Sequence, residues 1–193
     1  MENLVPKSLH GLKPREPFFK KVINNYFPKD KSVKIIEIGC GHGSFQYFIQ
    51  QAGYENSIGV DGSEEQIDGG KLLGIGNIIL GDMIDYIEAQ EDNSCDMVIA
   101  NDVLEHITKE ELTSFIEELF RVLKEDGLII AHLPNSEGPF GSFSKDGDFT
   151  HEQSFTRQSI AQIFLASNFN SVQTYEDKPI IHGILSFFRF VLW

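Results

Sequence analysis

Three glycines alternate with other residues directly after a short, β-branched apolar run near the start of the chain. The run covers residues 33–38, and the glycines are Gly39, Gly41 and Gly43. Glycine at every second position lets the backbone pass close beneath a ligand with no side chain between them. The spacing differs from the G-x-G-x-x-G pattern that holds a dinucleotide pyrophosphate, and no phosphate-binding Gly-Lys-Ser/Thr follows. We therefore expect the loop to bind a cofactor that lacks phosphates.

Polar residues also follow the next apolar runs. Asp61 ends the run at residues 57–61, 22 residues after Gly39, where a carboxylate can accept hydrogen bonds from both ribose hydroxyls of an adenosine. Asp82 and Met83 follow the third run, where a carboxylate and an apolar thioether can bracket an adenine. Asn101 ends the fourth run. Together these positions predict a site for a ribose-containing ligand.

The elements that must position these residues alternate between strand and helix patterns. Short apolar runs at 33–38, 57–61, 77–82, 95–101 and 128–133 predict strands, with a helical pattern after most of them. Strands that alternate with helices at this interval imply right-handed crossovers. The sequence therefore predicts an α/β fold, a doubly wound, mostly parallel, Rossmann-like sheet with helices on both faces.

The helix after the fourth run has the strongest pattern in the chain. Thr108 and Glu111 predict a capping box at its start. Asp126 and Gly127 predict a C-cap that closes it. Its apolar stripe is formed by Leu112, Phe115, Ile116, Leu119, Phe120 and Leu123.

The pattern changes after Pro134. Residues 135–150 are rich in Gly, Ser, Pro and Asp, and such a long loop at the edge of a sheet usually carries substrate contacts. Thr156 is expected to cap a last helix, and residues 172–175 are read as a closing strand.

Residues 33–134 resemble the class I S-adenosylmethionine-dependent methyltransferases, which implies the fold of that class and one methyltransferase domain over residues 1–193. The resemblance rests on four motifs in order, Glu37-Ile38-Gly39-Cys40-Gly41-His42-Gly43, Gly59-Val60-Asp61, Gly81-Asp82-Met83 and the segment from Cys95 to His106.

The resemblance also implies roles for these residues, with S-adenosylmethionine as cofactor and S-adenosylhomocysteine as product. The three glycines would line the methionine part, Glu37 would orient the loop, and Asp61 would hold the ribose. Asp82 and Met83 would contact adenine, and the backbone of Asn101 would face the amino group. Gly62 and Cys40 complete the expected cofactor-binding set, with Cys40 as a small neutral filler rather than a nucleophile.

Histidines are the natural candidates for activating a hydroxyl acceptor, because their pKa lies near neutrality. His106 follows the fourth strand and His151 lies just beyond the long loop. Both are candidate catalytic residues, and a structural role stays open for each. Methyl transfer is an in-line displacement for which orientation supplies much of the rate, so a fixed base is not obligatory. His132 lies inside the fifth strand and is interpreted as a core histidine.

The stretches Leu133-Pro134-Asn135, Asp148-Phe149-Thr150-His151-Glu152 and Phe155-Thr156 resemble the distal half of bacterial methyltransferases of polysaccharide and small-metabolite biosynthesis. This favours O-methylation of a small acceptor such as a sugar, a nucleotide sugar or a lipid-linked glycan, with ubiquinone-type phenols as the rival class. The proline motif expected for N-methylation of bases is absent after Asn101, and the net charge is −13. No nucleic-acid partner is therefore expected.

Charge and apolar residues are distributed unevenly at the two ends. Residues 1–32 are predicted to be a basic, helical arm, either a solvated face or a contact for an anionic substrate or membrane headgroup. Ten of the fourteen residues at 180–193 are Ile, Leu, Phe, Val or Trp. The apolar end is too short to span a bilayer. It fits an interfacial helix beside a lipid-linked acceptor, a core-packing segment, or the contact of a homodimer.

The cysteines and the chain start point to a cytoplasmic protein. Cys40 and Cys95 match no metal-ligand spacing, so we expect neither a disulfide nor a metal site. The chain start lacks the pattern of a secretory signal. Two alternatives remain open from sequence, an NAD-dependent Rossmann enzyme and a cofactor-binding subunit without turnover.

Overall fold

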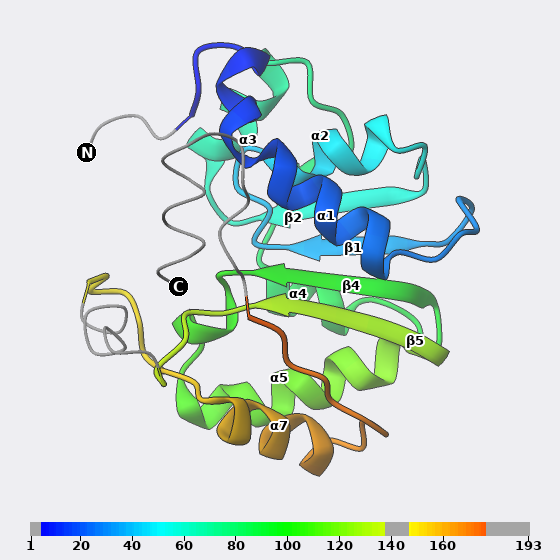
Figure 1. Ribbon diagram of the computed structural model, residues 1–193, viewed down its shortest axis with the longest axis vertical. Helices are drawn as coiled ribbons and strands as arrows, with labels where there is room; N and C mark the ends of the chain where they lie inside the picture. The colour runs from blue at the N-terminus through cyan, green and yellow to red at the C-terminus, as the bar shows by residue number, and fades with distance from the viewer. Residues whose placement is uncertain (1–4, 138–146, 177–193) are drawn as a thin grey trace.

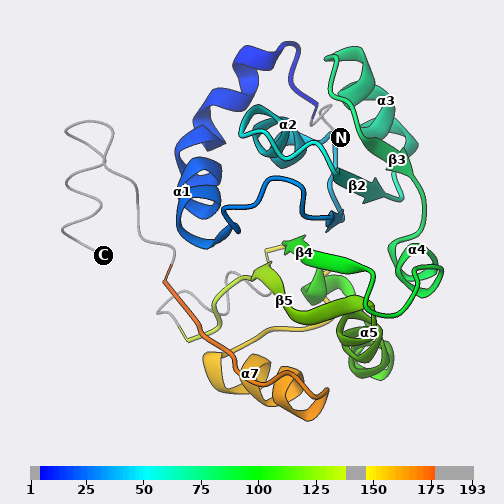
Figure 2. The ribbon, with the colours of Figure 1, turned by 90° about the vertical axis from the view of Figure 1, so that its right-hand side faces the viewer.

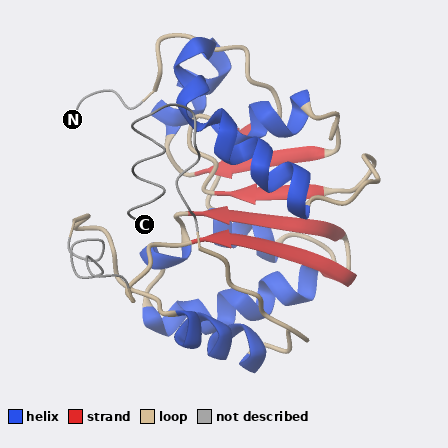
Figure 3. Cartoon of the chain, viewed as in Figure 1, coloured by secondary structure: helices blue, strands red, loops and turns tan. Residues whose placement is uncertain are grey.

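The computed structural model describes residues 5–137 and 147–176, and these contain one five-stranded parallel sheet. The strand order is β3-β2-β1-β4-β5, and every pairing is parallel (Figure 3). The doubly wound α/β fold predicted from sequence is confirmed. The strands are β1 (Ile35–Ile38), β2 (Ser57–Asp61), β3 (Ile78–Leu80), β4 (Cys95–Asn101) and β5 (Leu123–His132).

Helices cover both faces of the sheet, as Figures 1 and 2 show. One face carries η1 (Leu9–Arg15), α1 (Glu16–Tyr26), α2 (Ser44–Gln51) and α3 (Glu64–Leu72). The other carries α4 (Met83–Glu88), η2 (Leu104–His106), α5 (Lys109–Val122) and α7 (Arg157–Ala166). The helical amino-terminal arm predicted from sequence therefore packs on the sheet as η1 and α1. No helix in the described part of the chain is long and apolar enough to cross a membrane.

Neighbouring residues of the central strands point to opposite faces, as the period of two in a strand requires. Ile35 lies in the apolar cluster beneath α1, α2 and α3, whereas Ile36 and Ile38 lie in the cluster beneath α4, α5 and α7. Met97 and Val98 of β4 divide in the same way. Burial on both sides explains why these strands are almost continuously apolar.

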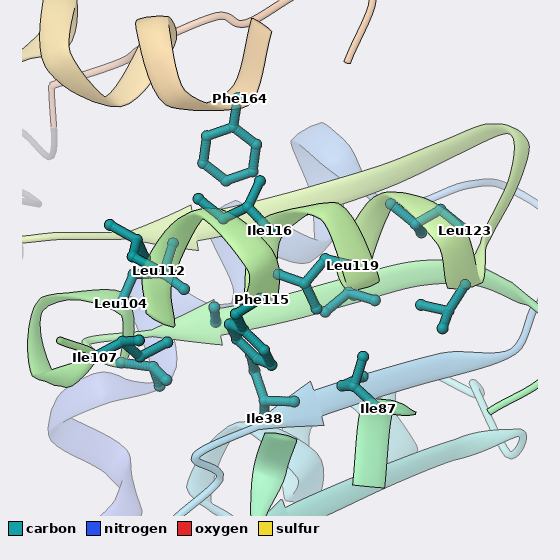
Figure 4. Packing of buried hydrophobic residues seen from close by; sticks show 14 of the residues in the cluster. Ile38, Ile87, Leu104, Ile107, Leu112, Phe115, Ile116, Leu119, Leu123 and Phe164 are labelled. Carbon is teal, nitrogen blue, oxygen red and sulfur yellow. The ribbon is translucent and has the colours of Figure 1, made fainter. Parts of the chain in front are cut away.

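Helix α5 lies between the sheet and α7 (Figure 4). Phe115 turns toward Ile38 of β1, and Phe164 of α7 lies beside Ile116 on the outer side of α5. Leu119 on the same helix is fully buried. Burying one such side chain contributes roughly 1.5–3 kcal/mol, so this stripe anchors α5 and sets the position of the chain on either side of it.

Two details predicted for α5 are wrong. The helix ends at Val122, and Leu123 instead begins β5 by pairing with Cys95. Asp126 and Gly127 therefore lie within β5 rather than at a helix C-cap, and Asp126 takes a left-handed φ of 65° there. At the other end, the Thr108 side chain accepts no hydrogen bond from the helix backbone; its hydroxyl donates to the Glu111 carboxylate at 2.5 Å. The capping box is thus not formed.

Only some of the predictions made for the residues after Pro134 agree with the structure. Thr156 and Ser159 form the capping box that opens α7, which confirms the predicted cap. The strand predicted at residues 172–175 is not formed, since these residues join no strand pairing in the described part of the chain. Val172 packs instead against the apolar cluster of α5. The apolar segment 180–193 and residues 138–146 of the long loop lie outside the described residues.

Candidate active site

The glycine loop joins β1 to α2 in a conformation that glycine favours. Gly39, Gly41 and Gly43 all have left-handed φ angles, of 63°, 55° and 79°. A Cβ atom at Gly39 would lie 2.5 Å from Cγ2 of Val103, so the loop and the segment after β4 are in direct contact. The absence of a side chain at Gly39 therefore allows the loop to lie directly against the segment after β4.

The Asp61 carboxylate at the end of β2 is held by two backbone donors. Oδ2 accepts from the N–H of Gly41 at 2.7 Å, and Oδ1 accepts from the N–H of Ser63 at 2.9 Å. Each carboxylate oxygen has further acceptor capacity after one hydrogen bond. The side chain is therefore fixed in position while it can still accept from two ribose hydroxyls.

A cavity of about 320 Å³ lies at the carboxyl ends of the strands. The strand order reverses between β1 and β4, which is where ligands bind in open α/β sheets. The volume falls in the range of small-molecule sites. The cavity is lined by Gly39, Asp61, Gly62, Asp82, Met83, Asp102, Val103 and His106.

Six of the predicted site residues therefore meet around one cavity. Gly41 and Gly43 belong to the same loop without lining the cavity, and Asn101 ends the neighbouring strand β4 half-buried. Asp82 is exposed and its Oδ1 accepts from the N–H of Ile84 at 2.8 Å, so this carboxylate also caps α4. The ligand-binding roles of these residues stay predictions.

Glu37 lies in β1, is 2% exposed, and is not among the residues that line the cavity. Burial raises the pKa of Glu37 to about 8, while the amides of Gln46 and Asn101 act in the opposite direction and the charge of Asp61 adds to the rise. The group is thus protonated over much of the neutral range. Its role in orienting the loop stays a prediction.

Cys40 is buried against the backbone of β2. A Cβ atom at Gly59 would lie 2.8 Å from Sγ of Cys40, so the thiol fills the space that this glycine leaves. Burial, with the nearby charges of Glu37 and Asp61, raises the pKa of the thiol far above its usual range. The filler role predicted for Cys40 fits this environment, because a neutral buried thiol is a poor nucleophile.

The two candidate catalytic histidines lie together although they are 45 residues apart in the chain (151 − 106). The ring centroids of His106 and His151 are 4.9 Å apart. His106 Nδ1 lies 3.1 Å from the backbone oxygen of Thr150 and 3.0 Å from its hydroxyl. The backbone oxygen of Glu105 accepts from the N–H groups of Glu152 and Gln153, which ties the two segments together.

Sequence reasoning missed Asp102 as a site residue. Its backbone has a left-handed φ of 53°, and Oδ1 lies 2.6 Å from Nδ1 of His132. Burial alone would raise the pKa of Asp102, but the hydrogen bond and charge of His132 outweigh it and the net pKa is lowered. His132, read as a core histidine, is instead the partly exposed partner of Asp102. The position of Asp102 after a predicted strand was the one signal available.

Comparison with known proteins agrees with this geometry. The model of a family described as "Methyltransferase domain" matches residues 12–174. The chain belongs to this methyltransferase family. A solved S-adenosylmethionine-dependent methyltransferase from Archaeoglobus fulgidus superposes with a TM-score of 0.72 at 26% identity, covering 82% of this chain and 71% of that one.

Two curated relatives are methyltransferases of different kinds. A protein named "Probable fatty acid methyltransferase" from Pseudomonas putida is 26% identical and covers 51% of this chain. A tRNA N(3)-cytidine methyltransferase of Gallus gallus is 23% identical and covers 93%. The chain spans 26% and 57% of the lengths of these two relatives.

The methyltransferase family and its cofactor are consistent with the cavity. Backbone without side chains at the glycine loop, a fixed carboxylate at Asp61 and an apolar thioether at Met83 fit the methionine, ribose and adenine parts of S-adenosylmethionine. The cofactor predicted from sequence is thus confirmed as that of the family. The NAD-dependent alternative is wrong, because the family match is to methyltransferases.

Proposed function

We propose that this protein methylates an oxygen atom of a small hydroxylated acceptor, with S-adenosylmethionine as the methyl donor. The observation that carries the proposal is the position of His106, which lines the cofactor cavity while its ring packs beside His151. The acceptor is thereby expected beside two groups that can interact with a hydroxyl proton.

When bound, S-adenosylmethionine supplies a methyl group on a sulfonium that already carries its leaving group. The work left to the chain is to hold an acceptor oxygen in line with that methyl group and to remove the hydroxyl proton. The backbone oxygen of Thr150 can only accept a hydrogen bond, so His106 Nδ1 donates to it. This leaves a lone pair on Nε2 when His106 is neutral, and that nitrogen can accept a proton.

Charge supports a small acceptor over a polynucleotide. The net charge of −13 disfavours binding of a phosphate backbone, even though one relative is a tRNA methyltransferase. Both cysteines are free and buried, which suits the cytoplasmic setting that we propose. A homodimer or a lipid-linked acceptor that contacts residues 180–193 remains part of this proposal.

The first test is calorimetric titration of the full chain with S-adenosylhomocysteine, with NAD as the control ligand. We expect binding of S-adenosylhomocysteine alone. Asp61→Ala should weaken this affinity about 10- to 100-fold, because charged hydrogen bonds are worth roughly 1.5–3 kcal/mol. Asp68→Ala, which removes an exposed carboxylate on α3, is the matched control and should change nothing. Equal affinities for the two variants would contradict the ribose-binding role of Asp61.

The second test is transfer of a labelled methyl group to a panel of sugars, nucleotide sugars, lipid-linked glycans, phenols, fatty acids and tRNA. We expect label on the oxygen of one hydroxylated class. His151→Gln should lower turnover while the S-adenosylhomocysteine affinity stays within about two-fold. Label on a fatty-acid carbon or on tRNA would overturn the acceptor class and leave the cofactor assignment intact.

A further inference from the structure

A buried carboxylate without a hydrogen-bond partner lies next to the two histidines. Glu105 is 1% exposed, and neither of its carboxylate oxygens has a hydrogen-bond partner among the described residues. Burial raises the pKa of Glu105, although the charges of His106 and His151 oppose the rise. Buried polar groups are almost always satisfied, so two unsatisfied oxygens on one side chain call for a partner.

The surroundings of this carboxylate contain the donor atoms of a metal site. One ligand atom each from Glu105, His106 and His151 lie within 4.8 Å of one another. Two imidazole nitrogens and one carboxylate oxygen are a ligand set that divalent first-row transition metals accept. Ligand atoms that share such an ion at 2.0–2.2 Å in a tetrahedral site lie roughly 3.3–3.6 Å apart, so the three groups need to approach by up to roughly 1.5 Å when the ion binds.

The hydrogen bond of His106 favours metal binding. Its Nδ1 donates to the backbone oxygen of Thr150 at 3.1 Å, which fixes the tautomer with a lone pair on Nε2. A metal-ligating histidine commonly donates its other ring N–H to a carbonyl or carboxylate in this way. Thr150 is held in turn, since its hydroxyl donates to Oδ1 of Asp148 at 2.7 Å.

We propose that Glu105, His106 and His151 bind one divalent transition-metal cation of the Zn²⁺, Co²⁺ or Mn²⁺ type at the acceptor side of the cavity. The ion would be the missing partner of the two Glu105 carboxylate oxygens. It would also be the group that contacts the acceptor. Two neutral imidazoles and one carboxylate leave a net charge of +1 on a dication. Coordination positions beyond these three stay open for water or acceptor oxygen.

The chemistry of the site follows from that charge, and this step rests on the proposed function. An acceptor hydroxyl bound to the ion has a lowered pKa, so its oxygen attacks the methyl carbon as an alkoxide or phenolate. The O–H proton goes to solvent, the new O–C bond forms, and the electron pair of the breaking C–S bond stays on sulfur. The histidines then act on the hydroxyl through the ion instead of as bases. Catechols, vicinal diols and similar chelating acceptors fit such a site best.

The experiment is titration of the 193-residue protein, without an affinity tag, with Co²⁺ and Zn²⁺ in the presence of S-adenosylhomocysteine, followed by visible absorption and calorimetry. We expect one equivalent to bind, with Mg²⁺ as a weaker competitor because it prefers oxygen ligands. Glu105→Gln and His151→Ala should each lower the Co²⁺ affinity at least about 10-fold. His10→Ala, which removes an exposed histidine of η1 outside the cluster, should stay within about two-fold.

Each outcome separates this proposal from the proposed function. Absence of stoichiometric Co²⁺ and Zn²⁺ binding by the wild-type protein, or unchanged affinity in both Glu105→Gln and His151→Ala, overturns the metal site. Because His151 lies outside helices and strands, His151→Ala tests the site even where Glu105→Gln fails to fold. Methyl transfer that persists in the presence of a chelator would overturn the metal's role and keep the methyltransferase assignment. Loss of S-adenosylhomocysteine binding in the wild type would instead contradict the cofactor site.

Discussion

The two halves of the cavity are built in different ways. The cofactor half is shaped mainly by backbone groups. Glycines with left-handed φ follow β1, and the N–H groups of Gly41 and Ser63 hold the Asp61 carboxylate. The acceptor half is assembled from side chains of distant segments, where His106 follows β4 and His151 comes after the long loop. Two hydrogen bonds to the backbone oxygen of Glu105 connect those segments.

This difference indicates which kind of substitution disrupts each half of the cavity. Backbone that passes against Val103 has no room for even one added methyl group, so the cofactor half is intolerant at single positions. The acceptor half depends instead on packing that keeps residues 147–156 against the core. Phe155 carries much of this packing, because it is 5% exposed within the α5 cluster.

Gly39→Ala is expected to have the largest effect. The added Cβ meets Cγ2 of Val103 at 2.5 Å, and the residue must also keep a φ of 63°. We expect S-adenosylhomocysteine affinity to fall by at least about 100-fold in calorimetric titration, since strain of this kind costs roughly 1–3 kcal/mol before the displaced backbone is counted. Gly53→Ala is the control, because it has a φ of 88° with open space around its Cβ. Equal affinity losses in the two variants would show that backbone strain alone explains the effect.

Phe155→Ala tests the acceptor half. Removing a buried aromatic ring should lower the free energy of unfolding by about 3 kcal/mol, as measured by urea denaturation. Methyl transfer should fall further than S-adenosylhomocysteine affinity at temperatures where the variant is folded, because His151 loses its support. Phe149→Ala is the stability control, since Phe149 is fully exposed. A parallel loss of cofactor affinity in Phe155→Ala would show that the two halves are not independent.

Glu37→Gln should have a smaller effect that depends on pH. The pKa of Glu37 is raised from 4.5 to about 8 by burial, so the folded protein holds this proton more tightly than the unfolded chain. The stabilisation is fully present below about pH 4.5 and is lost as the pH rises toward 8. Urea denaturation without ligand should show Glu37→Gln gaining stability over the wild type across this interval. Parallel pH profiles for the two proteins would contradict the protonated, buried state of Glu37.

Much of the cofactor half could be predicted from local sequence. The run before Gly39 is a strand buried on both faces, and Asp61 lies at a strand end as predicted. Short-range rules of turn, strand and cap formation suffice there, because each feature depends on neighbours in the chain. The same rules failed at α5, where pairing of Leu123 with Cys95 ended the helix earlier than its apolar stripe suggested.

The sequence by itself determined the alternation of strands and helices, the glycine loop and the polar strand ends, since these are set by local backbone preference and by burial period. Only the tertiary structure decided that Glu105, His106 and His151 meet, and that Asp102 pairs with His132. His151 is 45 positions from His106 and His132 is 30 from Asp102 (151 − 106, 132 − 102), and these contacts depend on how β4, β5 and the distal segment pack. The distances between these side chains cannot be predicted from their spacing in the sequence, because the packing of the whole fold sets them.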